Sequence, residues 1–168
     1  MKFLGLLLAG GAAAYSITVV NNCNSTIWPA AYQHNFDNIY PFATIAEDES
    51  GVELPSGYEW TISVPDNWIG GRIWARQSQP ASVYVTDYDF ISSLTVAEFG
   101  YGGGMIAYDI SRVQGWNLGC SIVASDGQTL DCASEGCAST QAFLLTDDYQ
   151  AVRESVSGTS FTVTFCPA

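Results

Sequence analysis

The stretch that most constrains the fold is Ser56 to Arg76, because its first half alternates apolar and polar side chains. Every second position is apolar in the row Tyr58, Trp60, Ile62 and Val64. That period of two predicts a strand with one face on a core and the other in solvent. Gly70-Gly71 allow the backbone to turn, and Ile73 to Arg76 begins a second strand. The stretch therefore predicts a hairpin.

The rest of the chain contains further short, β-branched segments separated by Gly, Pro, Asn and Asp. We expect strands at Ser16–Asn21, Thr26–Ala31, Ser93–Phe99, Met105–Ser111 and Ser160–Ala168. Between them, Tyr32–Leu54 is predicted to be an irregular, solvated loop, and Ser139–Val152 has room for a helical turn or two. Because the 168 residues can bury a sizeable core, the pattern predicts one all-β sandwich.

The N-terminus has the pattern of a short secretory signal, Met1–Ala14. Lys2 is its basic start, Phe3–Leu8 its apolar centre, and Ala12–Ala14 the small-residue cleavage site. A buried first strand is the alternative interpretation. We expect a secreted, extracellular mature domain from residue 15 to residue 168, since no later run is apolar enough to span a membrane.

Charge and cysteine content limit the partners. Lys and Arg number 5 against 17 Asp and Glu, for a net charge of −12. Nucleic acids and anionic membranes need basic patches, so neither is expected, whereas an uncharged polysaccharide is allowed. Five cysteines in an oxidising compartment predict disulfides with one thiol left over. With His34 as the sole histidine, no zinc site, other metal or cofactor is expected.

Several motifs together resemble the thaumatin-like protein family. S-G-x-x-W-T-I and G-G-R-I-W-A-R lie within Ser56–Arg76, and ITVVNNCNSTIWPAA spans Ile17–Ala31. A-E-F, Y-D-I-S followed by G-W-N-L, and V-T-F-C-P follow later in the chain. The resemblance covers the core strands and implies a compact antiparallel sandwich of two sheets. It also implies that this chain lacks most of the family's second, cysteine-rich lobe.

The resemblance also implies a disulfide between Cys23 and Cys166, because the family ties these two ends together. Cys132 with Cys137 is the preferred second pair, which leaves Cys120 over. Asn24 begins an N-S-T sequon on an expected surface turn, so we predict that it is glycosylated in a eukaryotic host.

Glu98 and Asp109 are the candidate catalytic residues. They flank the Gly100–Gly104 turn, so a hairpin would place two carboxylates at one end of a sheet, as glycoside hydrolysis requires. Mutual repulsion should then raise the pKa of one carboxyl, and we expect Glu98 to act as the acid. From spacing alone, two solvated surface acids are the simpler interpretation.

The family's acidic cleft combines one Arg, one Glu and three Asp. Arg72, Glu98 and Asp109 match its first three members. Gln114 stands where the second Asp is usual, and Asp147 or, preferably, Asp148 could supply the last. Trp68 and Tyr101 are expected to stack on sugar rings, although Trp68 could instead cover a core edge.

These observations predict a secreted, monomeric thaumatin-like protein that binds β-1,3-glucan or a related cell-wall polysaccharide. An endo-β-1,3-glucanase using Glu98 and Asp109 is the alternative. A second alternative is an interaction or inhibitor protein that uses the sandwich only as a scaffold.

Overall fold

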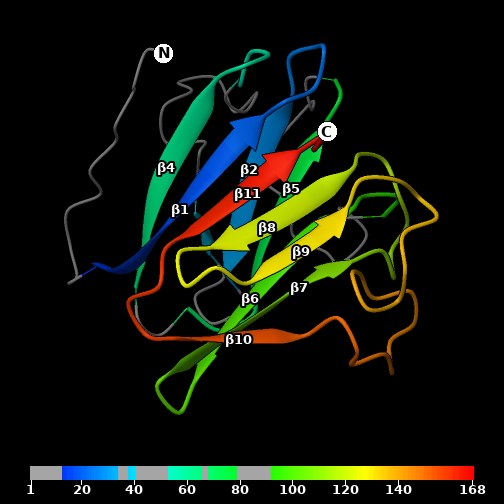
Figure 1. Cartoon of the computed structure of the whole chain (residues 1–168). Helices are drawn as coiled ribbons and strands as arrows, with labels where there is room; N and C mark the ends of the chain where they lie inside the picture. The colour runs from blue at the N-terminus through cyan, green and yellow to red at the C-terminus, as the bar shows by residue number, and fades with distance from the viewer. Residues whose placement is uncertain (1–12, 34–37, 41–52, 66–67, 79–91) are drawn as a thin grey trace.

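The computed structural model describes residues 13–33, 38–40, 53–65, 68–78 and 92–168. Within these residues the chain forms eleven strands and no helix (Figure 1). The strands are β1 Ala13–Asn21, β2 Trp28–Gln33, β3 Asn38–Tyr40, β4 Glu59–Pro65, β5 Gly71–Arg76, β6 Val96–Gly102, β7 Met105–Ser111, β8 Cys120–Ala124, β9 Thr129–Cys132, β10 Arg153–Val156 and β11 Phe161–Phe165. None of the described segments is a helix long and apolar enough to cross a membrane.

The described strands form two layers. One sheet has the order β4-β1-β11-β8-β9 and faces the viewer in Figure 1, and the other has the order β10-β7-β6-β5-β2-β3. Neighbouring strands are antiparallel except for β1 and β11, which pair in parallel. Alternate side chains of both sheets, such as Ile17 and Val19 on β1 and Ala97 and Phe99 on β6, meet in a common core. The predicted antiparallel sandwich of two sheets is confirmed.

The predicted hairpin between the strands of Ser56–Arg76 is wrong. β4 pairs with β1, whereas β5 pairs with β2 and β6 in the other sheet. The chain therefore crosses between the layers after Pro65 and before Gly71. Alternation showed that each segment is a strand, but it contains no information about the strand's neighbour.

Trp68 lies in this crossing and is a core residue, so its predicted sugar-stacking role is wrong. Its side chain is 0% exposed, and its ring stacks on Phe99 with centroids 5.9 Å apart. A Cβ on Gly71 would lie 2.6 Å from the indole ring, so glycine is needed where the chain enters β5. Trp68 fills the space between the two layers and has no face available to a ligand.

Several elements in the second half differ from the expectation. The β8–β9 hairpin and β10 were not predicted, and Ser139–Val152 contains turns but no helix. In β10 the polar Ser155 is buried and the apolar Val156 is exposed. A half-buried strand is recognised in sequence by the opposite pattern, with apolar residues inside and polar residues outside. β3 lies in the segment expected to be irregular, of which residues 34–37 and 41–52 are outside the described residues.

The structure contains both expected disulfides, Cys23–Cys166 and Cys132–Cys137. Cys120 is a buried free thiol. Asn24 lies exposed on the turn after β1, where glycosylation stays a prediction. β1 begins at Ala13, which overlaps the last two residues of the predicted signal, and cleavage before Tyr15 also stays a prediction.

Candidate functional site

A polar row crosses three adjacent strands on the outer face of the six-stranded sheet. Arg72 on β5 lies directly opposite Glu98 on β6, which lies directly opposite Asp109 on β7. Because side chains alternate along a strand, Ala97 and Phe99 beside Glu98 enter the core. The register thus aligns the three motif residues, which are far apart in sequence, side by side on one face.

Arg72 and Glu98 form an ion pair at the accessible end of this row. Arg72 Nε donates a hydrogen bond to Glu98 Oε1 at 2.8 Å. The two side chains are 17% and 28% exposed, so the pair can still contact a ligand. It presents a guanidinium donor and a carboxylate acceptor in a fixed orientation.

Asp109 has a different environment from Glu98. Its Oδ1 atom is buried and has no hydrogen-bond partner among the described residues. Burial raises the pKa of Asp109 to about 8, with Glu98 adding to the rise and Arg72 opposing it. The pKa of one carboxyl of the pair is therefore raised, as expected, and that carboxyl is the one of Asp109. Burial raises this pKa more than the repulsion by Glu98 does.

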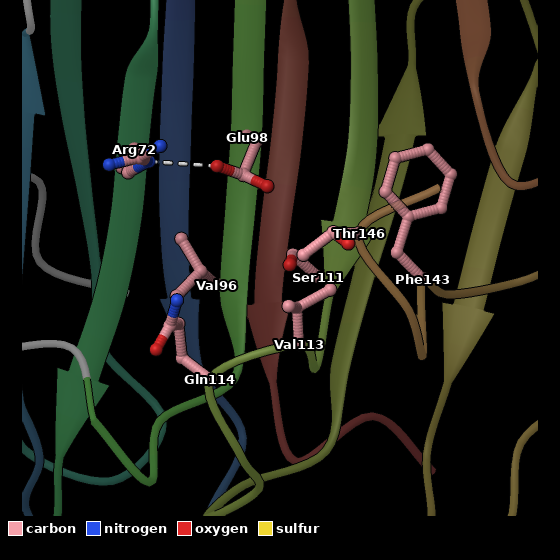
Figure 2. Close-up of a pocket in the computed structure, with 8 residues that line it drawn as sticks. All are labelled: Arg72, Val96, Glu98, Ser111, Val113, Gln114, Phe143 and Thr146. Carbon is pink, nitrogen blue, oxygen red and sulfur yellow. Dashed lines mark hydrogen bonds and ion pairs between the residues drawn. The ribbon is translucent and has the colours of Figure 1, made fainter. Parts of the chain in front are cut away.

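A hollow of about 280 Å³ lies beside the Arg72–Glu98 pair (Figure 2). Its floor comes from β5, β6 and β7, and its sides come from the segments that follow β7 and β9. The lining residues are Arg72, Val96, Glu98, Ser111, Val113, Gln114, Phe143 and Thr146. Asp109 is not among them, so the hollow exposes one acidic residue of the row rather than two.

Asn117 holds the side of the hollow that carries Val113 and Gln114. Its Oδ1 accepts from Thr95 N at 2.9 Å, and its Nδ2 donates to Ala75 O at 2.8 Å. Gly115 has a φ of 133°, and a Cβ there would lie 2.6 Å from the Cα of Ser93. The G-W-N-L motif is thus explained by the close approach of Gly115 to the Ser93 backbone and by the Asn117 amide, which joins β5 to the residue before β6.

Phe143 forms the opposite side of the hollow. Its N donates to Ile110 O at 2.8 Å and its carbonyl accepts from Arg112 N at 2.9 Å, so it bridges to the end of β7. Figure 2 shows the ring standing beside Ser111 and Thr146. Sequence reasoning missed Phe143, because no local pattern shows that this segment returns to β7.

Two other expected ligand contacts lie elsewhere. Asp148 is not a lining residue; its Oδ2 accepts from Leu144 N at 2.9 Å and Leu145 N at 3.1 Å, which fixes the turn that carries Phe143 and Thr146. Tyr101 lies on the same face of β6 as Phe99 and packs against the core. Neither residue lines the hollow, and a contact of Asp148 or Tyr101 with a ligand stays a prediction.

Comparison with known proteins identifies the family of this chain. A family model described as "Thaumatin family" matches residues 21–82. A "Thaumatin-like protein" of Oryza sativa subsp. japonica is 32% identical over 175 residues, covering 96% of this chain and 90% of the relative. The chain belongs to the thaumatin family. Another relative, "Pathogenesis-related protein 1A/1B" of Hordeum vulgare, is 33% identical over 96% of this chain and 93% of its own.

Solved structures show the same thaumatin-like fold. The thaumatin-like xylanase inhibitor TLXI has a TM-score of 0.67 at 21% identity, covering 90% of this chain and 99% of the inhibitor. The protein elicitor MoHrip2 from Magnaporthe oryzae has a TM-score of 0.66 at 14% identity, covering 92% and 100%. This thaumatin-like chain therefore has the same architecture as these two proteins over nearly their full lengths.

Proposed function

We propose that this thaumatin-like chain is a secreted protein that binds β-1,3-glucan or a related cell-wall polysaccharide in the hollow beside Arg72 and Glu98. The observation that carries the proposal is the Arg72–Glu98 ion pair, held partly exposed at 2.8 Å on the floor of the hollow. The pair offers both donors and acceptors to sugar hydroxyls while adding little net charge at that point.

The opposite side of the hollow supports the same ligand. Phe143 is partly buried, so its position is fixed while part of its ring is accessible. An aromatic face next to polar groups suits a pyranose, whose axial C–H groups bury apolar area and whose hydroxyls need hydrogen bonds. Val113, which is partly exposed, adds apolar surface beside the polar groups.

Binding is favoured over hydrolysis because the two carboxyls are not equally accessible. A glycosidase needs both acids to flank the scissile bond, whereas only Glu98 lines the hollow. Gln114 also replaces a further acid with a neutral amide. An endo-β-1,3-glucanase that uses Glu98 and Asp109 is therefore the less favoured alternative.

The test is sedimentation with insoluble β-1,3-glucan. We expect the wild-type protein to co-sediment and both Glu98→Gln and Phe143→Ala to weaken binding by about tenfold. Glu135→Gln, an exposed acid outside the hollow, is the matched control for lost charge. Absence of wild-type binding would reject the proposal, and release of reducing sugar from laminarin by the wild type but not by Glu98→Gln would establish the glucanase instead.

A second candidate is the inhibition of a secreted enzyme by protein–protein contact. The support is the structural similarity to a thaumatin-like xylanase inhibitor, 99% of whose chain is covered by the comparison. The test is inhibition of purified xylanases, one basic and one acidic, in the presence of the full chain. Unchanged xylanase rates with saturating protein would reject it and leave polysaccharide binding unaffected.

A further inference from the structure

The turn from Phe143 to Tyr149 concentrates exposed apolar side chains. Leu144 is 39% exposed, Leu145 62% and Tyr149 79%. Among the described residues, seven large apolar side chains are exposed to this degree, and three of them lie within these seven positions. The four others, Tyr58, Ile69, Val123 and Val156, come from separate parts of the fold. Such a concentration is typical of an interaction surface.

The turn is held in one conformation by its own hydrogen bonds. Besides the two bonds that Asp148 accepts, Asp148 N donates to Leu145 O at 3.2 Å. At the base, Arg153 donates to Thr140 O at 3.1 Å and to Gln150 O at 3.2 Å. Ala142 and Ala151 are fully buried on either side of the turn. A turn fixed in this way loses little conformational entropy when it binds a partner.

The apolar side chains of the turn do not belong to the hollow. Phe143 and Thr146 line it, whereas Leu144, Leu145 and Tyr149 do not. Leucine side chains are flexible aliphatic groups without a flat face, so they suit a protein pocket better than a sugar ring. The turn therefore has two sides. Phe143 and Thr146 form the side that lines the hollow, and Leu144, Leu145 and Tyr149 form a second side that is free to contact a partner.

Charge decides which partner fits this second side. Asp147 is exposed at the tip of the turn, and the whole chain carries −12. Two copies of the chain, like the chain and an anionic membrane, would repel each other at long range. A partner with an apolar pocket bordered by Lys and Arg would be attracted and would bury the leucines.

We propose that the turn Phe143–Tyr149 is a docking element for a basic secreted protein, in which Leu145 and Tyr149 enter an apolar pocket and Asp147 pairs with the basic border. The inference rests on the second proposed function, binding of a secreted enzyme, and names the surface and the charge of that enzyme. It is independent of polysaccharide binding in the hollow.

The experiment measures binding of the full chain to a purified basic xylanase and to an acidic xylanase by biolayer interferometry. We expect binding to the basic enzyme only, and a loss of about tenfold or more in affinity for both Leu145→Ser and Tyr149→Ser. The matched control is Val156→Ser, because Val156 is 61% exposed, like Leu145 at 62%, and lies at the end of β10, outside the turn. Asp147→Asn should mainly slow association.

The possible contrary results separate the two proposals. Binding of a xylanase that Leu145→Ser and Tyr149→Ser leave unchanged would overturn the docking turn while the enzyme-binding function stands. No binding to either xylanase would overturn both. Concentration-dependent dimerisation or sedimentation with phosphatidylserine vesicles, if lost in Leu145→Ser, would assign the turn to a second copy or a membrane and overturn the protein partner.

Discussion

The fold favours the protonated form of Asp109, because its Oδ1 atom is buried and Glu98 lies beside it. Its pKa rises from the ordinary value of 3.8 to about 8 in the fold. A carboxyl whose folded pKa is raised favours folding most below its unfolded pKa, and this contribution is lost as the pH rises towards the folded value. The protonated side chain can also donate a hydrogen bond, which an ordinary Asp cannot do at neutral pH.

The first prediction is that Asp109→Asn removes this pH dependence. Between about pH 4 and pH 8 the free energy of unfolding of the wild type should fall relative to that of the variant, by up to about 5 kcal/mol. Urea unfolding at pH 5 and pH 8.5 measures the difference, with Glu135→Gln as the control for an exposed acid. Parallel pH profiles for Asp109→Asn and the wild type would contradict the prediction.

The second prediction concerns Cys120. Its side chain is 0% exposed, and burial, with a smaller effect of Asp131, raises the pKa of the thiol to about 12. Because the thiolate is the reactive form, iodoacetamide should label Cys120 only after denaturation. Mass spectrometry of native and urea-treated protein tests this, and equal labelling rates in the two states would show that the thiol is accessible.

At the scale of the element, the crossing from β4 to β5 depends on contact between Gly71 and Trp68. The third prediction is that Gly71→Ala destabilises the fold by about 2 to 4 kcal/mol, because the added methyl would overlap the fully buried ring of Trp68. Gly100→Ala on β6 is the matched control, since a Cβ there meets nothing within 4 Å. Urea denaturation measures the free energy of unfolding of both variants. An equal loss of stability in the two would show that the contact with Trp68 does not determine the effect.

At the scale of the whole molecule, the Cys23–Cys166 bond joins the turn after β1 to the end of β11, across a sequence separation of 143 residues. Closing so long a loop in the unfolded chain stabilises the fold by about 5 kcal/mol on chain-entropy grounds, against about 2 kcal/mol for a loop of a few residues. Cys132–Cys137, separated by 5 residues, provides that comparison within the same protein.

The fourth prediction follows from this difference. Replacing Cys23 and Cys166 together by Ser should lower the free energy of unfolding by clearly more than replacing Cys132 and Cys137 together. Urea unfolding followed by tryptophan fluorescence measures both double variants. If the short-loop pair costs as much as the long-loop pair, loop closure is not the main source of the stabilisation.

Local patterns in the sequence determined which segments are strands and which face of each strand is apolar. The alternation from Tyr58 to Val64 predicted β4, and the segment Met105–Ser111 predicted β7, because side-chain direction along a strand depends only on position within it. These properties are local, so the sequence states them directly. That Arg72, Glu98 and Asp109 share one cleft was implied by the resemblance to the thaumatin-like family and not by a local pattern.

Only the tertiary structure decided which strands pair and which side chains lose contact with water. β4 and β5 belong to different sheets, Trp68 is in the core, and Phe143 returns to β7 to complete the hollow. Burial, more than the adjacent acid, sets the charge of Asp109. Each of these depends on contacts between segments distant in sequence, and the energy of such contacts is fixed by packing in three dimensions rather than by local periodicity.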